Sequence, residues 1–431
     1  MNYQESVEFI HGIDRFGSKP GLRRIQQMLE RMGNPQQYLR FIHVAGTNGK
    51  GSTSLIMARV LQESGYRVGR FSSPHLHSYR ERFEVNGTPI EFPELFAHLR
   101  EIGKTIDGMC SRGYERPTEF EILTALAFLW FNQSRVDVAI LEVGMGGSYD
   151  ATNVGSPLVS VITSIGLDHT EYLGHSLEEV AGNKAGIIKP KIPVVIGKLP
   201  PQAQLVVEQM AAAQGSPLLY SSSAQVLRTG SRGLNTLLSI DPEGWRLTEV
   251  PFSLSGDFQL ENLCTALTTL KVLMEMGWQI SGEAVYRGLG ALVHPGRMEV
   301  VAGPPLVVLD VAHNPSGAQA LAHALQTLFP GRRRVLLVGI LDDKDVSSIL
   351  APLEAQSRLC IVTRPHSPRA REWQQVKHAW DQLHLSNPAW LEEDIPRAVK
   401  LAKAMLKSDE YLLVTGSFYV LDEARRCLMT T

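Results

Sequence analysis

The segment of this chain best suited to chemistry is a glycine-rich loop that contains one lysine. An apolar run at 41–45 leads into the residues GTNGKGS at 46–52, and a helix-compatible stretch follows. Glycines let backbone N–H groups close around an anion, because no Cβ atoms stand in the way. A strand, a glycine turn and a helix N-terminus with a lysine form the layout of a phosphate-binding loop. Lys50 would bring positive charge to the β- and γ-phosphates of a nucleotide, and a hydroxyl there can reach Mg²⁺.

The loop departs from the common pattern G-x-x-x-x-G-K-[ST] at two positions. Val44 stands where the first glycine would be, and Gly51 separates Lys50 from Ser52. The departures make a common kinase or GTPase a poorer match than a relative with a shorter loop. The alternative interpretation is a glycine-rich turn between a strand and a helix, with the lysine in solvent.

Polar residues also stand just past other apolar runs, where open α/β sheets bind their ligands. Glu142 ends the run VDVAILEV, and a carboxylate there can hold Mg²⁺. Its alternative role is a solvated side chain in a tight turn. Ser73 could complete a metal shell or lie in a turn without chemistry. His169 follows LVSVITSI, but Mg²⁺ prefers oxygen ligands, so a structural or surface histidine is the alternative.

Charged side chains further along the chain are candidates for phosphate chemistry. Lys184 can bind phosphate, or react with CO₂ to give a carbamate that serves as a carboxylate ligand; otherwise it is a solvated helix lysine. Arg297 follows HPG and could neutralise γ-phosphate charge in the transition state. Asp310 and His313 follow an apolar run and would face the nucleotide if two domains closed on it. The alternative for Asp310 is a polar group at a helix N-terminus.

Alternating strands and helices must position these residues. Uninterrupted apolar strands favour a parallel sheet covered on both faces. Amphipathic helical patterns fill the gaps, and 217–251 is interpreted as a small antiparallel excursion. The expected strands are 41–45, 67–72, 136–143, 158–165 and 193–196, then 306–311, 334–339, 359–363 and 411–415.

The chain, at 431 residues, is too long for one core, so two α/β domains are expected. A Pro-Gly turn signal in ALVHPGR (291–297) marks a boundary. We predict a phosphate-loop ATPase domain with a parallel-rich sheet over 1–295. A C-terminal Rossmann-like α/β domain would cover 296–431.

Composition excludes several classes of protein. Apolar residues make up 44%, charged residues 20%, and the net charge is −2, which indicates a globular protein without a nucleic-acid or membrane partner. The apolar run at 122–131 is too short to span a bilayer, and residues 1–17 lack the pattern of a signal peptide. The four cysteines show no metal-ligand or redox spacing, so we expect reduced thiols in a cytoplasmic protein.

Taken together, ten segments in order resemble the folylpolyglutamate synthase/dihydrofolate synthase family, a branch of the Mur ligase superfamily. Gly51 after the lysine is typical of the folate branch, since Mur ligases proper tend to have threonine or serine there. The matching segments are HVAGTNGKGS (43–52), SSPHL (72–76), ERFEVNG (81–87), TEFEILTALAF (118–128), LEVGMGG with DATN (141–153), TSIGLDHTEYLG (163–174), AGNKAGIIKP (181–190), HPGRME (294–299), LDVAHNP (309–315) and TGSFY (415–419).

The resemblance implies an ATP-dependent, ADP-forming ligase that adds L-glutamate to a folate and to dihydropteroate. Mg-ATP would phosphorylate a substrate carboxylate to an acyl phosphate, which the amine of glutamate attacks. Two Mg²⁺ sites, small-molecule substrates and a monomeric enzyme are expected. Domain closure would exclude water from the acyl phosphate.

The same resemblance assigns site residues. Catalytic roles fall to Lys50, Lys184, His169 and Arg297. Nucleotide-binding positions are matched by Gly46, Thr47, Asn48, Gly49, Lys50, Gly51, Ser52, Asn262, Arg297 and Asp310. The metal positions are matched by Ser52, Ser73, Glu142, His169 and a carbamylated Lys184. Phe120 and Asp150 fall at the pterin end of the substrate, and His313 and Ser417 near the glutamate pocket.

Several positions depart from the family pattern. Ser148 stands where arginine is frequent, so a substrate or loop contact is missing or replaced. Phe258 replaces a common histidine, which puts part of the adenine pocket in doubt. Other departures are Asn183, His294 and Val311, and none removes a core catalytic group. Two alternatives remain: a Mur-type ligase acting on a nucleotide-linked sugar-peptide, and a nucleotide-binding module without ligase chemistry.

Overall fold

The computed structural model describes residues 21–221, 226–232, 235–241, 245–301, 303, 305–383 and 387–429. The N-terminal segment that we expect to lack a signal peptide lies outside these residues. None of the helices in the described ranges is long and apolar enough to cross a membrane. The chain divides into two compact units, the second of which holds the chain from Val293 onward together with 231–236 and 252–260.

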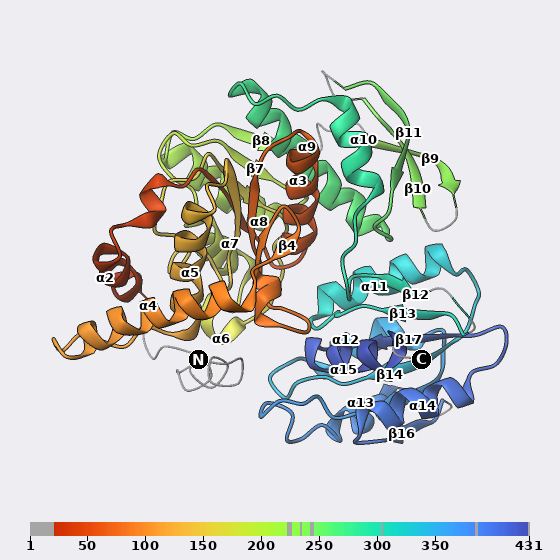
Figure 1. Ribbon diagram of the computed structural model, residues 1–431. Coiled ribbons are helices and arrows are strands. Elements are labelled where there is room, and N and C mark those ends of the chain that lie inside the picture. Colours follow the sequence, from red (N-terminus) through yellow and green to blue (C-terminus); the bar gives the residue numbers. More distant parts are fainter. Residues whose placement is uncertain are drawn as a thin grey trace. The chain divides into compact units, whose positions relative to one another are not determined.

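The first unit is built on an eight-stranded sheet with the order β4-β3-β2-β5-β1-β6-β7-β8. Figure 1 labels β4, β7 and β8 of this sheet. β3 and β4 run antiparallel to their neighbours, and the other strands are parallel. β1 lies between β5 and β6, although both follow it much later in the chain. The strands are β1 Phe41–Ala45, β2 Val68–Phe71, β3 Phe83–Val85, β4 Thr88–Pro89, β5 Val138–Glu142, β6 Val159–Ile162, β7 Val194–Ile196 and β8 Leu218–Tyr220.

The central strands are apolar because they are buried on both faces. Every residue of β1, β5 and β6 is buried. One core cluster joins the sheet to α2, α4 and α5, and another joins it to α7 and α8. The helical elements are α2 Arg23–Arg31, η1 Pro35–Tyr38, α3 Lys50–Glu63, η2 Tyr79–Arg82, α4 Phe92–Cys110, α5 Glu119–Gln133, α6 Thr170–Leu173, α7 Leu177–Ala185, α8 Pro201–Ala213, α9 Asp257–Glu275 and α10 Gly282–Gly290.

A separate three-stranded sheet has the order β11-β10-β9, with β9 Val226–Arg232, β10 Asn235–Ile240 and β11 Leu247–Phe252. It lies in the region expected to form a small antiparallel excursion, and its antiparallel pairing stays a prediction. The start of the expected excursion was placed wrongly. Residues 218–220 form β8, which pairs parallel with β7 in the large sheet. This strand is too short to show a periodic pattern of its own.

The second unit is a Rossmann-like layer of strands and helices. Its sheet has the order β12-β13-β17-β14-β15-β16, and only β12 among these strands runs antiparallel to its neighbour. The strands are β12 Glu299–Val301, β13 Val307–Leu309, β14 Arg334–Val338, β15 Ser357–Val362, β16 Ala389–Leu391 and β17 Tyr411–Thr415. The helices are α11 Pro315–Leu328, α12 Val346–Glu354, α13 Gln375–Leu383, α14 Ile395–Met405 and α15 Phe418–Met429.

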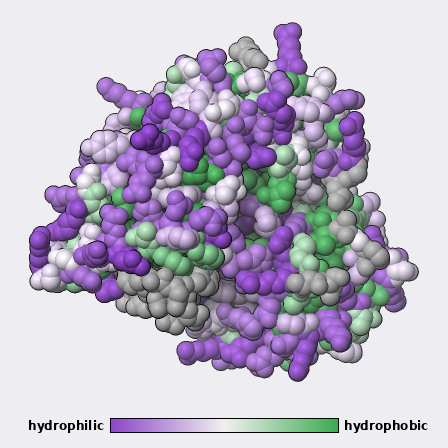
Figure 2. All heavy atoms as spheres, in the orientation of Figure 1, coloured by the Kyte–Doolittle hydropathy of each residue, from purple (hydrophilic) through white to green (hydrophobic). Residues whose placement is uncertain are grey.

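The predicted fold class, α/β with parallel-rich sheets, is confirmed. The division into domains at 295/296 stays a prediction about units that fold independently. The face drawn in Figure 2 is mostly hydrophilic, and hydrophobic side chains appear in small groups. Scattered exposure of this kind is usual on a globular protein.

Candidate active site

Three parallel strands of the first unit end side by side, and each is followed by polar residues. Val44 pairs with Glu142 of β5, and Ala45 pairs with Ile162 of β6. The phosphate-binding loop, the Glu142 carboxylate and the segment from Thr163 therefore share one edge of the sheet. This is the position at which open parallel sheets bind ligands.

The phosphate-binding loop is held by the segment that follows β6. The backbone N–H of Thr47 donates to Ser164 O at 2.8 Å. The carbonyl oxygen of Asn48 accepts from Thr163 Oγ1 at 2.6 Å and from Ser164 Oγ at 2.9 Å. The sequence predictions did not include these two hydroxyl residues. Their only signal in the sequence is a pair of hydroxyl side chains at the end of an apolar strand.

The loop packs so closely against Thr163 and Asn262 that two of its positions have room only for glycine. Gly49 is the N-cap of α3 with φ +83°, and a Cβ there would lie 2.2 Å from Asn262 Oδ1. A Cβ on Gly46 would lie 2.0 Å from Thr163 Oγ1. The loop therefore runs directly into α3, whose first N–H groups have no partner within the helix. Such N–H groups at a helix N-terminus are suited to bind the phosphates of a nucleotide. Asn262, predicted to contact nucleotide, lies against this loop.

Two lysines meet at the loop. Lys50 Nζ donates to the carbonyl oxygen of Gly46 at 2.9 Å, and Lys184 Nζ donates to the same oxygen at 3.1 Å. Burial, and then the positive charge of Lys50, lower the pKa of Lys184 to about 7, while Asp168 and Asp150 act in the opposite direction. A lysine with this pKa is partly a neutral amine at neutral pH.

The predicted metal ligands offer one carboxylate, two hydroxyls and an imidazole, and Mg²⁺ is usually bound by one or two carboxylates together with substrate phosphates and water. Glu142 and Ser52 are buried, and Ser73 follows β2, which pairs with β5. The side chain of His169 is 37% exposed, and its backbone has φ +51°. Within the described ranges, no three His, Cys, Asp or Glu side chains gather in a group that could hold a metal. A carbamate on Lys184 would add a second anionic oxygen ligand to the Glu142 carboxylate.

The predicted pterin residues lie at the turn that follows β5, at 144–153. The Phe120 ring packs against Gly144, where a Cβ would lie 2.5 Å from the ring. Asp150 is buried, and its Oδ2 accepts from the N–H groups of Gly144 and Met145 at 3.0 Å each. Burial raises the pKa of Asp150, and these donors oppose that shift. Its contacts give Asp150 a role in shaping the turn, and contact with a substrate stays a prediction.

Ser148 and Phe258, two residues that depart from the family pattern, both make packing or hydrogen-bond contacts in the structure. The backbone N–H and Oγ of Ser148 both donate to Asn183 O, at 2.9 and 3.0 Å. A Cβ on Gly186 would lie 2.0 Å from Ser148 Oγ, so the serine fills the space beside the end of α7. Phe258 packs against the core of the second unit.

The remaining predicted residues meet in the second unit, at the ends of β13 and β17. These strands are neighbours, with Leu309 opposite Val414. Asp310 is buried and accepts from the N–H groups of Met298 at 2.8 Å and Ala312 at 2.9 Å. Burial raises the pKa of Asp310, and the charges of Arg297 and His313 oppose that rise.

Aromatic and capping contacts complete this group. The Arg297 guanidinium lies 5.0 Å from the centre of the Phe418 ring, and the His313 ring lies 6.2 Å from it. The buried Ser417 hydroxyl accepts from Val420 N at 3.3 Å at the start of α15. The structure therefore brings Arg297, Asp310, His313 and Ser417 to one edge of the second sheet.

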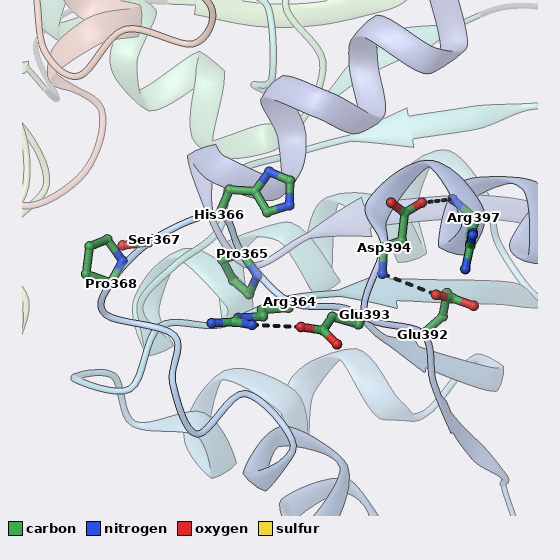
Figure 3. Close-up of a pocket in the computed structure, with 9 residues that line it drawn as sticks. All are labelled: Arg364, Pro365, His366, Ser367, Pro368, Glu392, Glu393, Asp394 and Arg397. Atoms are coloured by element: carbon green, nitrogen blue, oxygen red, sulfur yellow. Dashed lines mark hydrogen bonds and ion pairs between the residues drawn. The ribbon is translucent and has the colours of Figure 1, made fainter.

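A pocket of about 720 Å³ also lies in the second unit, past the ends of β15 and β16 (Figure 3). None of the predicted site residues lines it. Two of its charged lining residues, Arg364 and Glu393, form an ion pair at 2.7 Å, and His366 pairs with Glu423 outside the pocket. Asp394 caps α14, accepting from the N–H of Arg397. These pairings leave the strand ends described above as the better candidate for chemistry.

Comparison with known proteins shows the family to which the chain belongs. Residues 44–270 match the Mur ligase middle domain, and residues 296–418 match the Mur ligase, glutamate ligase domain. A dihydrofolate synthase/folylpolyglutamate synthase from Bacillus subtilis is 37% identical over 429 residues, covering 99% of each chain.

Solved structures of folylpolyglutamate synthases are similar to this chain over almost its whole length. A Mycobacterium tuberculosis folylpolyglutamate synthase complexed with ADP has a TM-score of 0.92 at 33% identity, covering 98% of each chain. A folylpolyglutamate synthase complex with AMPPCP and folate has a TM-score of 0.88 at 34% identity, covering all of both chains. This chain therefore belongs to the Mur ligase family, in the folylpolyglutamate synthase/dihydrofolate synthase branch of ATP-dependent, ADP-forming ligases.

Proposed function

We propose that this ligase joins L-glutamate to the carboxyl group of a folate, and that it accepts dihydropteroate as well. The observation that carries the proposal is the meeting of the phosphate loop, buried Glu142 and Lys184 at one edge of the first sheet. The folate complex of a full-length relative supports the acceptor class. ATP would transfer its γ-phosphoryl group to the substrate carboxylate, and the glutamate amine would then displace phosphate from the acyl phosphate.

In this proposal the loop amides and Lys50 bind the phosphates. Ser52 and Glu142 hold one Mg²⁺, and Ser73, His169 and a carbamylated Lys184 complete the metal ligands. When bound, Mg²⁺ neutralises charge that develops on the phosphoryl oxygens. Lys50 now donates to backbone carbonyls, so it would exchange these partners for phosphate oxygens without moving far from the loop.

Carbamylation of Lys184 is consistent with its environment. The neutral amine would add to CO₂, forming an N–C bond and releasing one proton, and its pKa of about 7 makes that amine available at neutral pH. The product is an anion, which relieves the repulsion between Lys184 and Lys50.

The second unit would supply the remaining contacts. We assign Arg297 and Asp310, with Asn262 of the first unit, to the nucleotide, and His313 and Ser417 to L-glutamate. Arg297 is the candidate for neutralising charge on the transferred phosphoryl group. The Asp310 carboxylate holds the backbone at Met298, next to Arg297, and so fixes the start of that segment.

The direct test is an acceptor assay. The protein is incubated with Mg-ATP, L-glutamate and either dihydropteroate or tetrahydrofolate, while ADP release and product mass are followed. We expect glutamate-dependent ADP release and a product heavier by one glutamyl residue, and we expect Lys50→Ala to abolish both. ATP binding without acceptor-dependent turnover would indicate a binding module instead. Turnover only with a nucleotide-linked sugar-peptide would indicate a Mur-type acceptor.

We also propose that the enzyme acts as a monomer in the cytoplasm. Among the described residues, no disulfide joins any of the four cysteines, Cys110, Cys264, Cys360 and Cys427. Light scattering of the purified protein tests the oligomeric state.

A further inference from the structure

A buried histidine that the proposed chemistry does not use lies in the central strand β1. His43 is fully buried, between Leu141 of β5 and Ser160 of β6. Its Nε2 lies 2.8 Å from Thr152 Oγ1. Its Nδ1 has no hydrogen-bond partner among the described residues. The ring also packs edge-on against Phe41, at 5.9 Å between ring centres, and its contact with Thr152 is the one hydrogen bond recorded for it among the described residues.

The contact continues to Asp150. Thr152 Oγ1 lies 2.5 Å from Asp150 Oδ1, and the N–H of Thr152 donates to the same oxygen at 3.0 Å. A hydroxyl has one proton, and a carboxylate can only accept, so the Thr152 hydroxyl donates to Asp150. It must therefore accept from His43, which assigns the neutral ring the tautomer with its proton on Nε2.

The turn held by Asp150 lies against the backbone of α7. A Cβ on Gly147 would lie 2.7 Å from the carbonyl oxygens of Asn183 and Lys184. Asn153 Nδ2 donates to Gly186 O at 3.0 Å, just past the helix. Any shift of the turn would therefore move the residues on both sides of Lys184.

These contacts form a continuous chain that begins and ends at β1; we refer to it below as the circuit. It starts at His43 in β1, passes through Thr152, Asp150 and the turn to Lys184, and returns to Gly46 at the end of the same strand. We propose that His43 is a positioning residue, which holds the turn at 144–153 through Thr152 and Asp150 and thereby places Lys184 against the phosphate loop. The proposal rests on the function assigned to Lys184 above.

The test compares His43→Leu, His43→Gln and a matched control. Leucine removes the donor, whereas glutamine keeps an N–H near the position of Nε2. Thr269→Val is the control, because it removes one buried hydrogen bond within α9, to Thr265 O at 2.8 Å, away from this circuit. Steady-state kinetics, thermal unfolding and hydrogen exchange of the peptide covering 144–153 are measured for each protein.

We expect His43→Leu to lower kcat by about 10- to 100-fold, as losses of groups that orient metal ligands do. The turn should exchange faster, and the KM for L-glutamate should change little. His43→Gln should recover most of kcat, and Thr269→Val should keep both kcat and exchange at the wild-type level. If His43→Leu does not fold, Thr152→Val removes the same link while keeping the side-chain shape.

A kcat for His43→Leu equal to that of Thr269→Val, or unchanged exchange at 144–153, would overturn the proposal. The two proposals fail separately. If the wild-type protein makes no glutamylated product, the proposed function is wrong, and the exchange of the turn still decides whether His43 positions it.

Discussion

Two cationic side chains share one acceptor in this protein, the carbonyl oxygen of Gly46. Lys50 reaches it from the first turn of α3, and Lys184 reaches it from α7. A phosphate group that entered the loop would offer Lys50 a better partner than a neutral carbonyl. The low pKa of Lys184 follows from its burial and from this proximity, since protonating a second amine beside Lys50 is unfavourable.

His43 makes the stability of the protein depend on pH. Burial, and then the charge of Lys189, lower the pKa of His43 to about 3. Between that value and the ordinary histidine pKa of about 6.5, the unfolded chain binds more protons than the folded chain. The free energy of unfolding therefore falls as the pH falls through this window, and the stability contributed by neutral His43 is fully present only above it.

We expect His43→Gln to remove this dependence. Relative to the variant, the wild-type protein should lose about 1–2 kcal/mol of unfolding free energy between pH 7 and pH 5. Urea denaturation of both proteins at these two pH values measures the difference. Parallel pH profiles would show that His43 titrates normally and is not buried in solution.

The residues that a local pattern could identify are those near a glycine turn or a strand end. Lys50 and Glu142 were found in this way. Thr163 escaped because its partner Asn48 is 115 residues away in the sequence. The carboxylate of Asp150 was noticed only through the family resemblance, which could not show that its oxygens bind the turn's own backbone. Packing across the sheet decides these roles, and no spacing in the sequence records it.

At the scale of elements, the position of α7 is fixed by contacts to its backbone as well as to its side chains. The turn at 144–153 approaches the helix so closely that Gly147 has no room for a Cβ. Because the neighbouring atoms are backbone atoms of Asn183 and Lys184, the helix itself would have to move. The position of Lys184 is therefore set by two elements, α7 and this turn.

Gly147→Ala should displace α7 and lower kcat, whereas Gly182→Ala should not. A Cβ on Gly182, inside α7, would meet only Val206, at 4.0 Å. Replacing a helix-interior glycine by alanine should add about 0.5–1 kcal/mol of stability. Thermal unfolding and steady-state kinetics separate the two effects. Equal kcat values for the two variants would show that the turn does not set the position of the helix.

The strands were largely predictable, and their ends were not. β1 and β17 match the expected 41–45 and 411–415. The expected strand at 158–165 runs past the end of β6, because Ile165 stays buried after the hydrogen-bonded ladder has stopped. Apolar character therefore reports burial, and only the partner strand decides where the ladder ends.

At the scale of the whole molecule, the residues proposed to bind ligands lie at two different sheets. The first unit carries the phosphate loop, Glu142 and Lys184 at the ends of β1 and β5 and on α7. The second carries Arg297, Asp310, His313 and Ser417 at the ends of β13 and β17. Each sheet has a core of its own beneath these residues. The assignment therefore predicts that L-glutamate stabilises elements of the second unit, whereas the nucleotide, which is also assigned to Arg297 and Asp310, stabilises elements of both units.

ADP should slow hydrogen exchange in peptides covering 41–54, 138–166 and 307–317. L-glutamate alone should slow it in peptides covering 307–317 and 411–421, and not in the first unit. Bound ligand stabilises the elements that hold it, by about 2.7 kcal/mol at one hundred times Kd. Exchange measured by mass spectrometry with each ligand alone checks the assignment. Protection by L-glutamate confined to the first unit would contradict the roles given to His313 and Ser417.

The place of β1 between β5 and β6 also has a consequence for biosynthesis. The phosphate loop is made well before its partners, since its contact with Thr163 spans 115 residues and that with Lys184 spans 138. Contacts of such long sequence separation close slowly, since the chain between them must first be ordered. A nascent chain that ends before α7 thus carries the whole glycine motif without the partners that shape it. The phosphate loop precedes these partners in the chain, and its contacts with them are complete only when α7 has been made.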